Sequence, residues 1–322
     1  MPPAGEVSQP QESTAQVAVL STKAPWRDAP RLRRRDSECG QRPDHMAAVK
    51  NPVFPSAVPQ GYTLYSLTYE SEGKPVQGYL GVPPGKGPFQ MVVVLQGGSP
   101  VKLSSRASTG GYSATAAADD VLPAPVMFFP NYRGYGPSPG DVQDGYHDYL
   151  DTVNGLKALR HIRGLHVAPH DTFLAGTSLG GFVALRLAAS DPDVRAVLLT
   201  SPWPGMDTVL GWLKTQFSQN PQSRSAYHKL RSYGGPKPGA WLRRNSITLA
   251  RIHVPILIIG GTEDQITPPS LLRYLDRQLS AGDPHVTLTF LPGGHAPTGT
   301  GWIDDFDTFM NREGLNMMVP EP

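Results

Sequence analysis

DTFLAGTSLGGFVALRLAA, residues 171–189, joins a short apolar segment to an Ala- and Leu-rich segment through a Gly-x-Ser-x-Gly turn. The first segment predicts a strand over 172–175, and the second predicts a helix that begins just after Ser178. A strand, a tight turn and a helix in this order are typical of a nucleophile elbow, which holds its serine in a strained backbone conformation. Such a turn needs small residues two positions before and after the serine, and Gly176 and Gly180 meet this need. The sequence therefore predicts Ser178 as a nucleophile.

A second literal match to the same pattern, Gly136-Pro-Ser138-Pro-Gly140, serves as a control. Pro139 has no N–H to donate to an oxyanion, and no apolar strand runs directly into this turn. The pattern alone also fits a plain strand-to-helix turn, so the surrounding strand and helix carry the argument. We expect Ser178, and not Ser138, to be reactive.

Composition places few limits on function but excludes some classes of protein. Of the 322 residues 39% are hydrophobic, and the formal net charge is +2, so no broad charge favours nucleic acid or a membrane as partner. The longest apolar runs, such as 91–95 and 256–259, are far too short to cross a bilayer. A single cysteine, Cys39, excludes an intrachain disulfide framework and a multi-cysteine zinc site. It fits a reducing compartment or a chain that needs no disulfides, and we expect a cytoplasmic location.

Residues 1–55 differ from the rest of the chain. They are rich in Pro, Gln, Ser and Ala, carry a basic cluster at 31–35, and show no sustained period of a helix or strand. This composition predicts a disordered or loosely attached arm before a domain that spans 56–322. The arginines alone suggest nucleic acid binding or a transit peptide, but interspersed acidic residues argue against both.

Apolar segments and helical segments alternate over most of the chain after residue 63. Unbroken apolar runs indicate strands buried on both faces, as parallel sheets require. The alternation predicts a single α/β domain with a doubly wound, mostly parallel sheet and helices on both faces. Together with the elbow around Ser178, this arrangement is typical of the α/β-hydrolase fold. Residues 101–120 are small and polar, and predict a loop with a helix near 114–119. The expected strands are 63–69 and 76–82 as an edge hairpin, then 91–95, 126–129, 172–175, 194–200, 256–259 and 286–291, and the main expected helices are 149–162, 179–189, 268–279 and 302–310.

The segment 203–248 breaks this alternation and is rich in Trp, Tyr, Gly, Pro and basic residues. Because it is inserted between two strands, it can stand above the carboxyl ends of the sheet as a small lid. Trp203 and Trp212 are candidates to line a substrate pocket there. Aromatic side chains in such a segment are equally suited to form its own packing core.

A nucleophilic serine needs a base, and the base needs an acid that fixes its tautomer. In hydrolases of this fold the acid and then the histidine follow the serine along the chain. Asp264 lies on a loop directly after the expected strand 256–259, with Glu263 as the alternative acid. His295 follows the last expected strand in Pro-Gly-Gly-His. We expect Ser178, Asp264 and His295 to form a catalytic triad.

An oxyanion hole needs two hydrogen-bond donors. The backbone N–H of Leu179 is one, and the second usually comes from the loop after the third strand. Here this loop reads Gln96-Gly97-Gly98, in which either glycine N–H can donate and Gln96 can add a side-chain amide near the substrate. A plain turn is the alternative for the glycine pair.

Several motifs in order resemble the catalytic domain of the prolyl oligopeptidase family, closest to its dipeptidyl aminopeptidase and acylaminoacyl peptidase-like branch. The resemblance covers about residues 63–316. It implies a serine hydrolase that cleaves peptide or ester bonds of small substrates without a metal or organic cofactor. The motifs are NYRGYG at 131–136, the helix with Asp148, GTSLGG at 176–181, GTEDQITP at 261–268 and GGH at 293–295.

Four departures from that family narrow the expected activity. The 62 residues before the first expected strand are too few for a β-propeller, and there is no paired-glutamate segment to hold a free amino terminus. Gln96 and Leu179 replace residues that are often aromatic in these peptidases. These departures favour a stand-alone esterase or a small acyl-peptide hydrolase. A non-catalytic binding protein of the same fold remains the alternative from another class.

Overall fold

A computed structural model describes the fold of this protein. The predicted arm lies outside the described residues except for four positions, and the helix expected near 114–119 lies outside them altogether. The described residues are 45–48, 62–98, 125–135, 138, 145–232, 238–281, 285–297 and 303–314.

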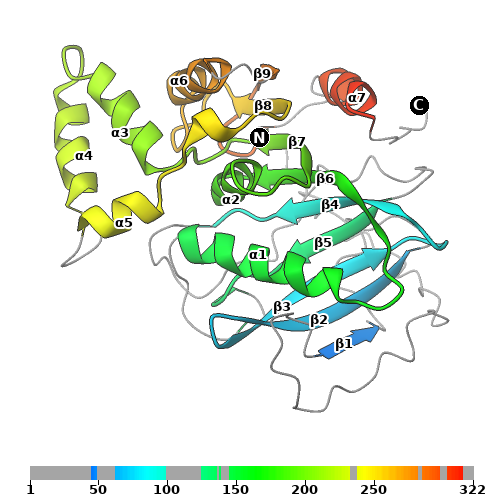
Figure 1. Ribbon diagram of the computed structural model, residues 1–322. Coiled ribbons are helices and arrows are strands. Elements are labelled where there is room, and N and C mark those ends of the chain that lie inside the picture. Colours follow the sequence, from blue (N-terminus) through cyan, green and yellow to red (C-terminus); the bar gives the residue numbers. More distant parts are fainter. Residues whose placement is uncertain are drawn as a thin grey trace, which may run out of the picture.

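A nine-stranded sheet forms the centre of the molecule (Figure 1). Its strand order is β1-β2-β3-β5-β4-β6-β7-β8-β9, and the six strands from β5 to β9 in this order run parallel. The first three strands pair antiparallel at one edge. The strands are β1 (His45–Ala48), β2 (Thr63–Ser71), β3 (Lys74–Val82), β4 (Phe89–Leu95), β5 (Val126–Pro130), β6 (Val167–Thr177), β7 (Val194–Thr200), β8 (Ile256–Gly261) and β9 (Val286–Leu291).

Helices cover both faces of this sheet, as a doubly wound fold requires. The buried residues fall into two clusters because side chains alternate between the faces along each strand. In β4, for example, Val93 belongs to the cluster that includes residues of α1, α2 and α6, whereas Val94 belongs to the cluster on the other face, which includes residues of α7. These helices are α1 (Gly145–Arg160), α2 (Leu179–Ala188), α6 (Pro269–Ser280) and α7 (Ile303–Arg312).

The insertion between β7 and β8 is helical and projects from the sheet (Figure 1). It consists of α3 (Met206–Thr215), α4 (Pro221–Arg231) and α5 (Pro238–Arg244), followed by the short 3-10 helix η2 (Leu249–Arg251). Phe217 and Tyr227 pack edge to face at 5.3 Å and form part of its own small core. The expected insertion is therefore present as a helical unit of its own.

Arg186 of α2 ties this insertion to the body of the protein. Its guanidinium carbon lies 4.8 Å and 4.9 Å from the ring centres of Tyr146 and Tyr149 in α1. The same guanidinium donates to the backbone carbonyls of Arg244 and Ser246, where the insertion returns to the sheet. One side chain therefore joins α1, α2 and the end of the insertion.

The largest differences from the expected strands are at β1 and β6. His45–Ala48 of the predicted arm forms an unexpected strand that pairs with β2, so four residues of that segment belong to the sheet. β6 begins at Val167 rather than Thr172, and its register against β4 shifts between these two positions. Within the described residues no helix combines the length and the hydropathy that a bilayer-spanning segment needs.

Candidate active site

Ser178 lies at the carboxyl end of β6, directly before α2, in a backbone conformation with φ 52° and ψ −116°. The backbone of a residue other than glycine is strained at such a positive φ, and it keeps this conformation only where the surrounding structure holds it. Here the Ser178 N–H donates to Thr200 O at 3.0 Å, and the Ser178 carbonyl accepts from Gly181 N at 2.9 Å and Trp203 N at 2.7 Å. The neighbouring strand and helix thus hold the turn in place.

Gly176 and Gly180, on the two sides of Ser178, lie so close to neighbouring backbone that neither position has space for a Cβ atom. A Cβ atom on Gly180 would overlap the Leu95 backbone carbonyl, and one on Gly176 would overlap the carbonyl of Gly180. The elbow therefore has the local geometry that the sequence predicts for it.

His295, in the loop after β9, bridges the serine and the acid. Its Nε2 lies 2.8 Å from Ser178 Oγ, and its Nδ1 lies 2.9 Å from Asp264 Oδ2. An ionised carboxylate only accepts, so Nδ1 carries the hydrogen and Nε2 is left to accept from the serine hydroxyl. The three side chains that the sequence predicts as a triad are thus hydrogen bonded in series, although they come from loops after three different strands.

The two carboxylate oxygens of Asp264 have different partners. Oδ1 accepts from the backbone N–H groups of Ile266 at 2.8 Å and Thr267 at 3.0 Å. Oδ2 faces His295 and also accepts from the Thr267 hydroxyl at 2.8 Å. Oδ1 therefore fixes the side chain in its loop, while Oδ2 is the oxygen that reaches the imidazole. Glu263, the alternative acid, is exposed beside it.

The pKa of Asp264 lies below its usual value. Its side chain is fully buried, and burial alone would raise the pKa of this carboxyl. The hydrogen bonds from the Thr267 backbone, the His295 ring, the Thr267 hydroxyl and the Ile266 backbone together outweigh burial and lower this pKa. Asp264 is consequently an anion at neutral pH and can stabilise a protonated imidazole.

The loop after β4 lies beside the elbow. A Cβ atom on Gly97 would be 4.0 Å from Ser178 Oγ, so the backbone here approaches the serine closely. Gly98 lies against the ring of Tyr135 instead. Leu179 is the first residue of α2, where backbone N–H groups have no partner within the helix. Gln96 buries its side-chain Nε2 without a hydrogen-bond partner among the described residues.

The two tryptophans expected to line a pocket differ in position. Trp203 packs its ring against that of Phe182 in α2, with the ring centres 5.0 Å apart, at the side of the main core. Its backbone N–H donates to the carbonyl of Ser178 in the elbow. Trp212 lies in α3, and its indole N–H is buried without a partner in the described part of the chain. The contacts of Trp203 are thus those of a packing residue.

Ser138 of the second Gly-x-Ser-x-Gly match and Arg133 of the motif NYRGYG both have structural contacts. Ser138 donates to Asn131 O at 2.7 Å and accepts from Gln77 N at 3.0 Å, far from any elbow geometry. Arg133 is buried and forms an ion pair with Asp151 at 2.5 Å. Neither residue contributes to the arrangement around Ser178.

Thr267 is the site residue that sequence reasoning missed. Its hydroxyl touches Asp264 Oδ2, lies 3.2 Å from Ser201 O and is 3.5 Å from His295 Nδ1. The local signal was a Thr three residues after the acid, a spacing typical of a turn that binds a carboxylate. The contact to Ser201, 66 residues away, has no local signal.

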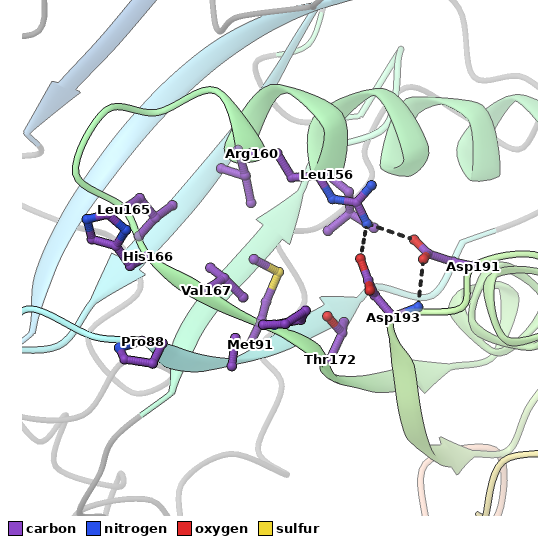
Figure 2. A pocket seen from close by; sticks show the side chains of 13 residues that line it. Pro88, Met91, Leu156, Arg160, Leu165, His166, Val167, Thr172, Asp191 and Asp193 are labelled. Carbon is purple, nitrogen blue, oxygen red and sulfur yellow. Dashed lines mark hydrogen bonds and ion pairs between the residues drawn. The ribbon is translucent and has the colours of Figure 1, made fainter.

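A cavity of about 390 Å³ lies near the starts of β4 and β6, at the end of the strands away from Ser178. Figure 2 shows the side chains that line it. Its floor includes Met91 near the start of β4 and Thr172 in β6, whereas Ser178 follows the end of β6. At its rim Arg160 pairs with Asp193 at 2.5 Å and Asp191 at 3.6 Å. This cavity is therefore separate from the Ser178 site.

Comparisons with known proteins agree with this fold. The model of the alpha/beta hydrolase family matches residues 114–305, more than half of the chain. An Arabidopsis thaliana protein named alpha/beta hydrolase domain-containing protein WAV2 is 26% identical over 201 residues, which cover 61% of this chain. The match spans 62% of the length of that relative.

Solved structures with the same fold include esterases and a peptidase. An acetyl xylan esterase from Paenibacillus sp. R4 has a TM-score of 0.58 at 18% identity, covering 84% of this chain and 89% of its own. A Pyrococcus furiosus esterase has a TM-score of 0.53 at 18% identity, covering 78% and 90%. An acylaminoacyl peptidase of Pyrococcus horikoshii has a TM-score of 0.57 at 15% identity, covering 82% of this chain but 43% of its own. By its family match and by its nine-stranded sheet, this chain belongs to the α/β hydrolase family.

Proposed function

We propose that this protein is a serine hydrolase that cleaves ester or acyl-peptide bonds through a Ser178-His295-Asp264 triad. The observation that carries the proposal is the position of His295, which is within hydrogen-bond distance of both the serine and the acid. The strained elbow supports it, because such backbone strain is concentrated at functional sites. The proposal needs no metal or organic cofactor for these steps.

Catalysis begins when Ser178 Oγ attacks the substrate carbonyl and its proton passes to His295 Nε2. The carbonyl oxygen becomes an oxyanion, which the N–H groups of Leu179 and of Gly97 or Gly98 stabilise. The tetrahedral intermediate then expels an alcohol or amine, which takes the proton from His295. An acyl-enzyme remains on Ser178.

Water completes the cycle. His295 takes a proton from water, the resulting hydroxide attacks the acyl-enzyme carbonyl, and a second tetrahedral intermediate forms in the same oxyanion hole. Its collapse releases a carboxylic acid and returns the proton to Ser178. Asp264 stays ionised throughout and stabilises the imidazolium that forms twice in each turnover.

Small esters are the substrates that we favour. Gln96 and Leu179 depart from the aromatic residues of the prolyl oligopeptidase-like peptidases that the chain resembles in sequence. Two fold neighbours are esterases that align over most of their length, whereas the acylaminoacyl peptidase aligns over 43% of its chain. Hydrolysis of acyl-peptides is the second candidate, and the family motifs favour it. We infer a small-molecule ester or short peptide as substrate, with neither nucleic acid nor membrane as partner, and a cytoplasmic location.

Labelling with a fluorophosphonate probe tests the proposal directly, since the probe reacts only with an activated serine. We expect labelling of the wild-type protein at Ser178 and none of Ser178→Ala. Hydrolysis of p-nitrophenyl acetate by Ser178→Ala should fall roughly a million-fold. A folded wild-type protein that is neither labelled nor active would instead be a binding protein of this fold. Comparing p-nitrophenyl esters with acyl-alanine anilides then separates esterase from peptidase.

A further inference from the structure

The hydroxyl of Thr267 lies at the junction between the acid and the imidazole. Its Oγ1 is 2.8 Å from Asp264 Oδ2 and 3.5 Å from His295 Nδ1, and Thr267 is only 1% exposed. Oδ2 is the same oxygen that receives the His295 N–H. Two donors, one from the base and one from Thr267, therefore share one carboxylate oxygen.

A hydroxyl has a single hydrogen, and the Thr267 hydroxyl has two acceptors within reach. Besides Asp264 Oδ2 it can donate to the backbone carbonyl of Ser201 at 3.2 Å. The carboxylate is nearer and charged, so it is the preferred acceptor in the resting enzyme. Rotation about one bond transfers the hydrogen to the carbonyl and leaves Oδ2 to His295 alone.

Ser201 is held so that this second acceptor is available. It follows β7 with φ 44°, is fully buried, and its N–H donates to Ile259 O at 2.8 Å. A left-handed conformation in a serine costs free energy and needs surroundings that fix it. The strained backbone thus presents its carbonyl to Thr267 at a fixed position.

We propose that Thr267 is a positioning residue that regulates the proton affinity of His295 by moving its hydroxyl hydrogen between Asp264 Oδ2 and the Ser201 carbonyl. Donation to Oδ2 weakens the carboxylate as a partner of the imidazole in the resting enzyme. When His295 takes the proton of Ser178, the hydroxyl turns to Ser201 and Oδ2 carries its full charge toward the imidazolium. No covalent bond changes in this step. The role rests on the proposed hydrolase function.

Among the described residues, the segments that supply the groups of this junction are 176–180, 201–203, 262–270 and 292–297. Apart from Asp264 and His295, the one ionisable side chain that could carry a charge in these segments is Glu263, which is exposed. Ser178 and Ser201, from the ends of β6 and β7, are uncharged. Asp264 and the hydroxyl that shares its oxygen are therefore the groups that the test has to separate.

The test compares Thr267→Val, which keeps the shape but removes the hydroxyl, with Thr267→Ser, which keeps the hydroxyl. With p-nitrophenyl acetate we expect kcat of Thr267→Val to fall about 10- to 100-fold with KM nearly unchanged. The acidic limb of its kcat/KM profile should move to higher pH, because the more basic carboxylate lets the imidazole keep its second proton. Thr267→Ser should retain the wild-type profile.

A second readout does not depend on turnover. In the proton NMR spectrum of the free enzyme, the Nδ1–H of His295 should move downfield in Thr267→Val, because the hydrogen bond to Oδ2 strengthens, and should stay in place in Thr267→Ser. The His295→Asn spectrum identifies the resonance, and Thr267→Ala replaces the valine variant if the latter does not fold. An unchanged pH profile and an unmoved resonance in a folded variant without the hydroxyl would overturn the proposal. A moved resonance in a protein without hydrolase activity would reject the proposed function but keep this role.

Discussion

A Cβ atom added to Gly97 would lie 3.3 Å from the Cβ atom of Ser178 and 3.4 Å from the carbonyl oxygen of Thr177. The first distance is tighter than most contacts of a Cβ atom and the second is at the limit of ordinary contact, so a side chain at position 97 would require the loop after β4 or the elbow to shift by a few tenths of an ångström. The site therefore depends on backbone placement on both sides of the serine.

Gly97→Ala should lower kcat/KM by roughly 100-fold, because shifting the serine or the donor loop by a fraction of an ångström disturbs the reacting geometry. Its free energy of unfolding should change by less than about 1 kcal/mol, since Gly97 is only half-buried. Gly239→Ala in α5 is the matched control, because its added Cβ meets only the Arg243 side chain at 3.6 Å. Ester hydrolysis and urea unfolding of both variants check the prediction, and equal activities would contradict it.

His295→Asn should lose activity by about 10⁴-fold or more, because an amide cannot accept and return the serine proton. The variant should also lose fluorophosphonate labelling while it keeps the circular dichroism spectrum of the wild type. His253→Asn replaces an exposed histidine outside the site and should behave as the wild type. If His295→Asn still reacted with the probe at the wild-type rate, another base would have to be sought.

Asp264 should make the stability of the protein depend on pH in a defined direction. Because its pKa is lowered on folding, its ionised form stabilises the native state in full above the unfolded value of roughly 3.9. This contribution is lost as the pH falls through the lower value in the folded protein. Urea unfolding at pH 6 and pH 3 should therefore show a smaller loss of stability in Asp264→Asn than in the wild type. An equal loss in both proteins would show that this carboxylate is not specially stabilised.

Arg186→Ala should loosen the helical insertion without altering the triad. The variant loses the contacts of the guanidinium with Tyr146 and Tyr149 and its hydrogen bonds to the insertion, which together are worth about 1–3 kcal/mol. We expect faster cleavage by a protease within residues 203–248. Arg273→Ala removes a similar guanidinium–ring contact, to Phe290 at 4.7 Å, away from the insertion, and should leave this cleavage rate unchanged.

The sequence was sufficient to predict the parallel part of the sheet. Strands buried on both faces appear as continuous apolar runs, so 194–200 was predicted with its observed bounds. The half-buried strand 286–291 was also predicted with its observed bounds. β1 has four residues and no pattern, and the start of β6 contains Pro169 and His170, so neither had a signal for a strand.

The site shows the same division between local and long-range information. The elbow and the two loops were predictable because each has its own glycines and follows its own strand. The sharing of Asp264 Oδ2 was not predictable, because it depends on how the Thr267 hydroxyl meets His295, 28 residues away. The pairing of Thr267 with the strained Ser201 likewise arises only when β7 and β8 lie side by side.

The acid and the base come from the last two strands of the sheet, while the nucleophile comes from its middle. β9 forms the edge, and five of its six residues are only half-buried, so this border should detach more readily than the interior. On gentle heating, catalytic power should then vanish while most of the helical signal persists. Enzyme assays would then measure the detachment of β9 alone, and calorimetry would measure the unfolding of the whole domain.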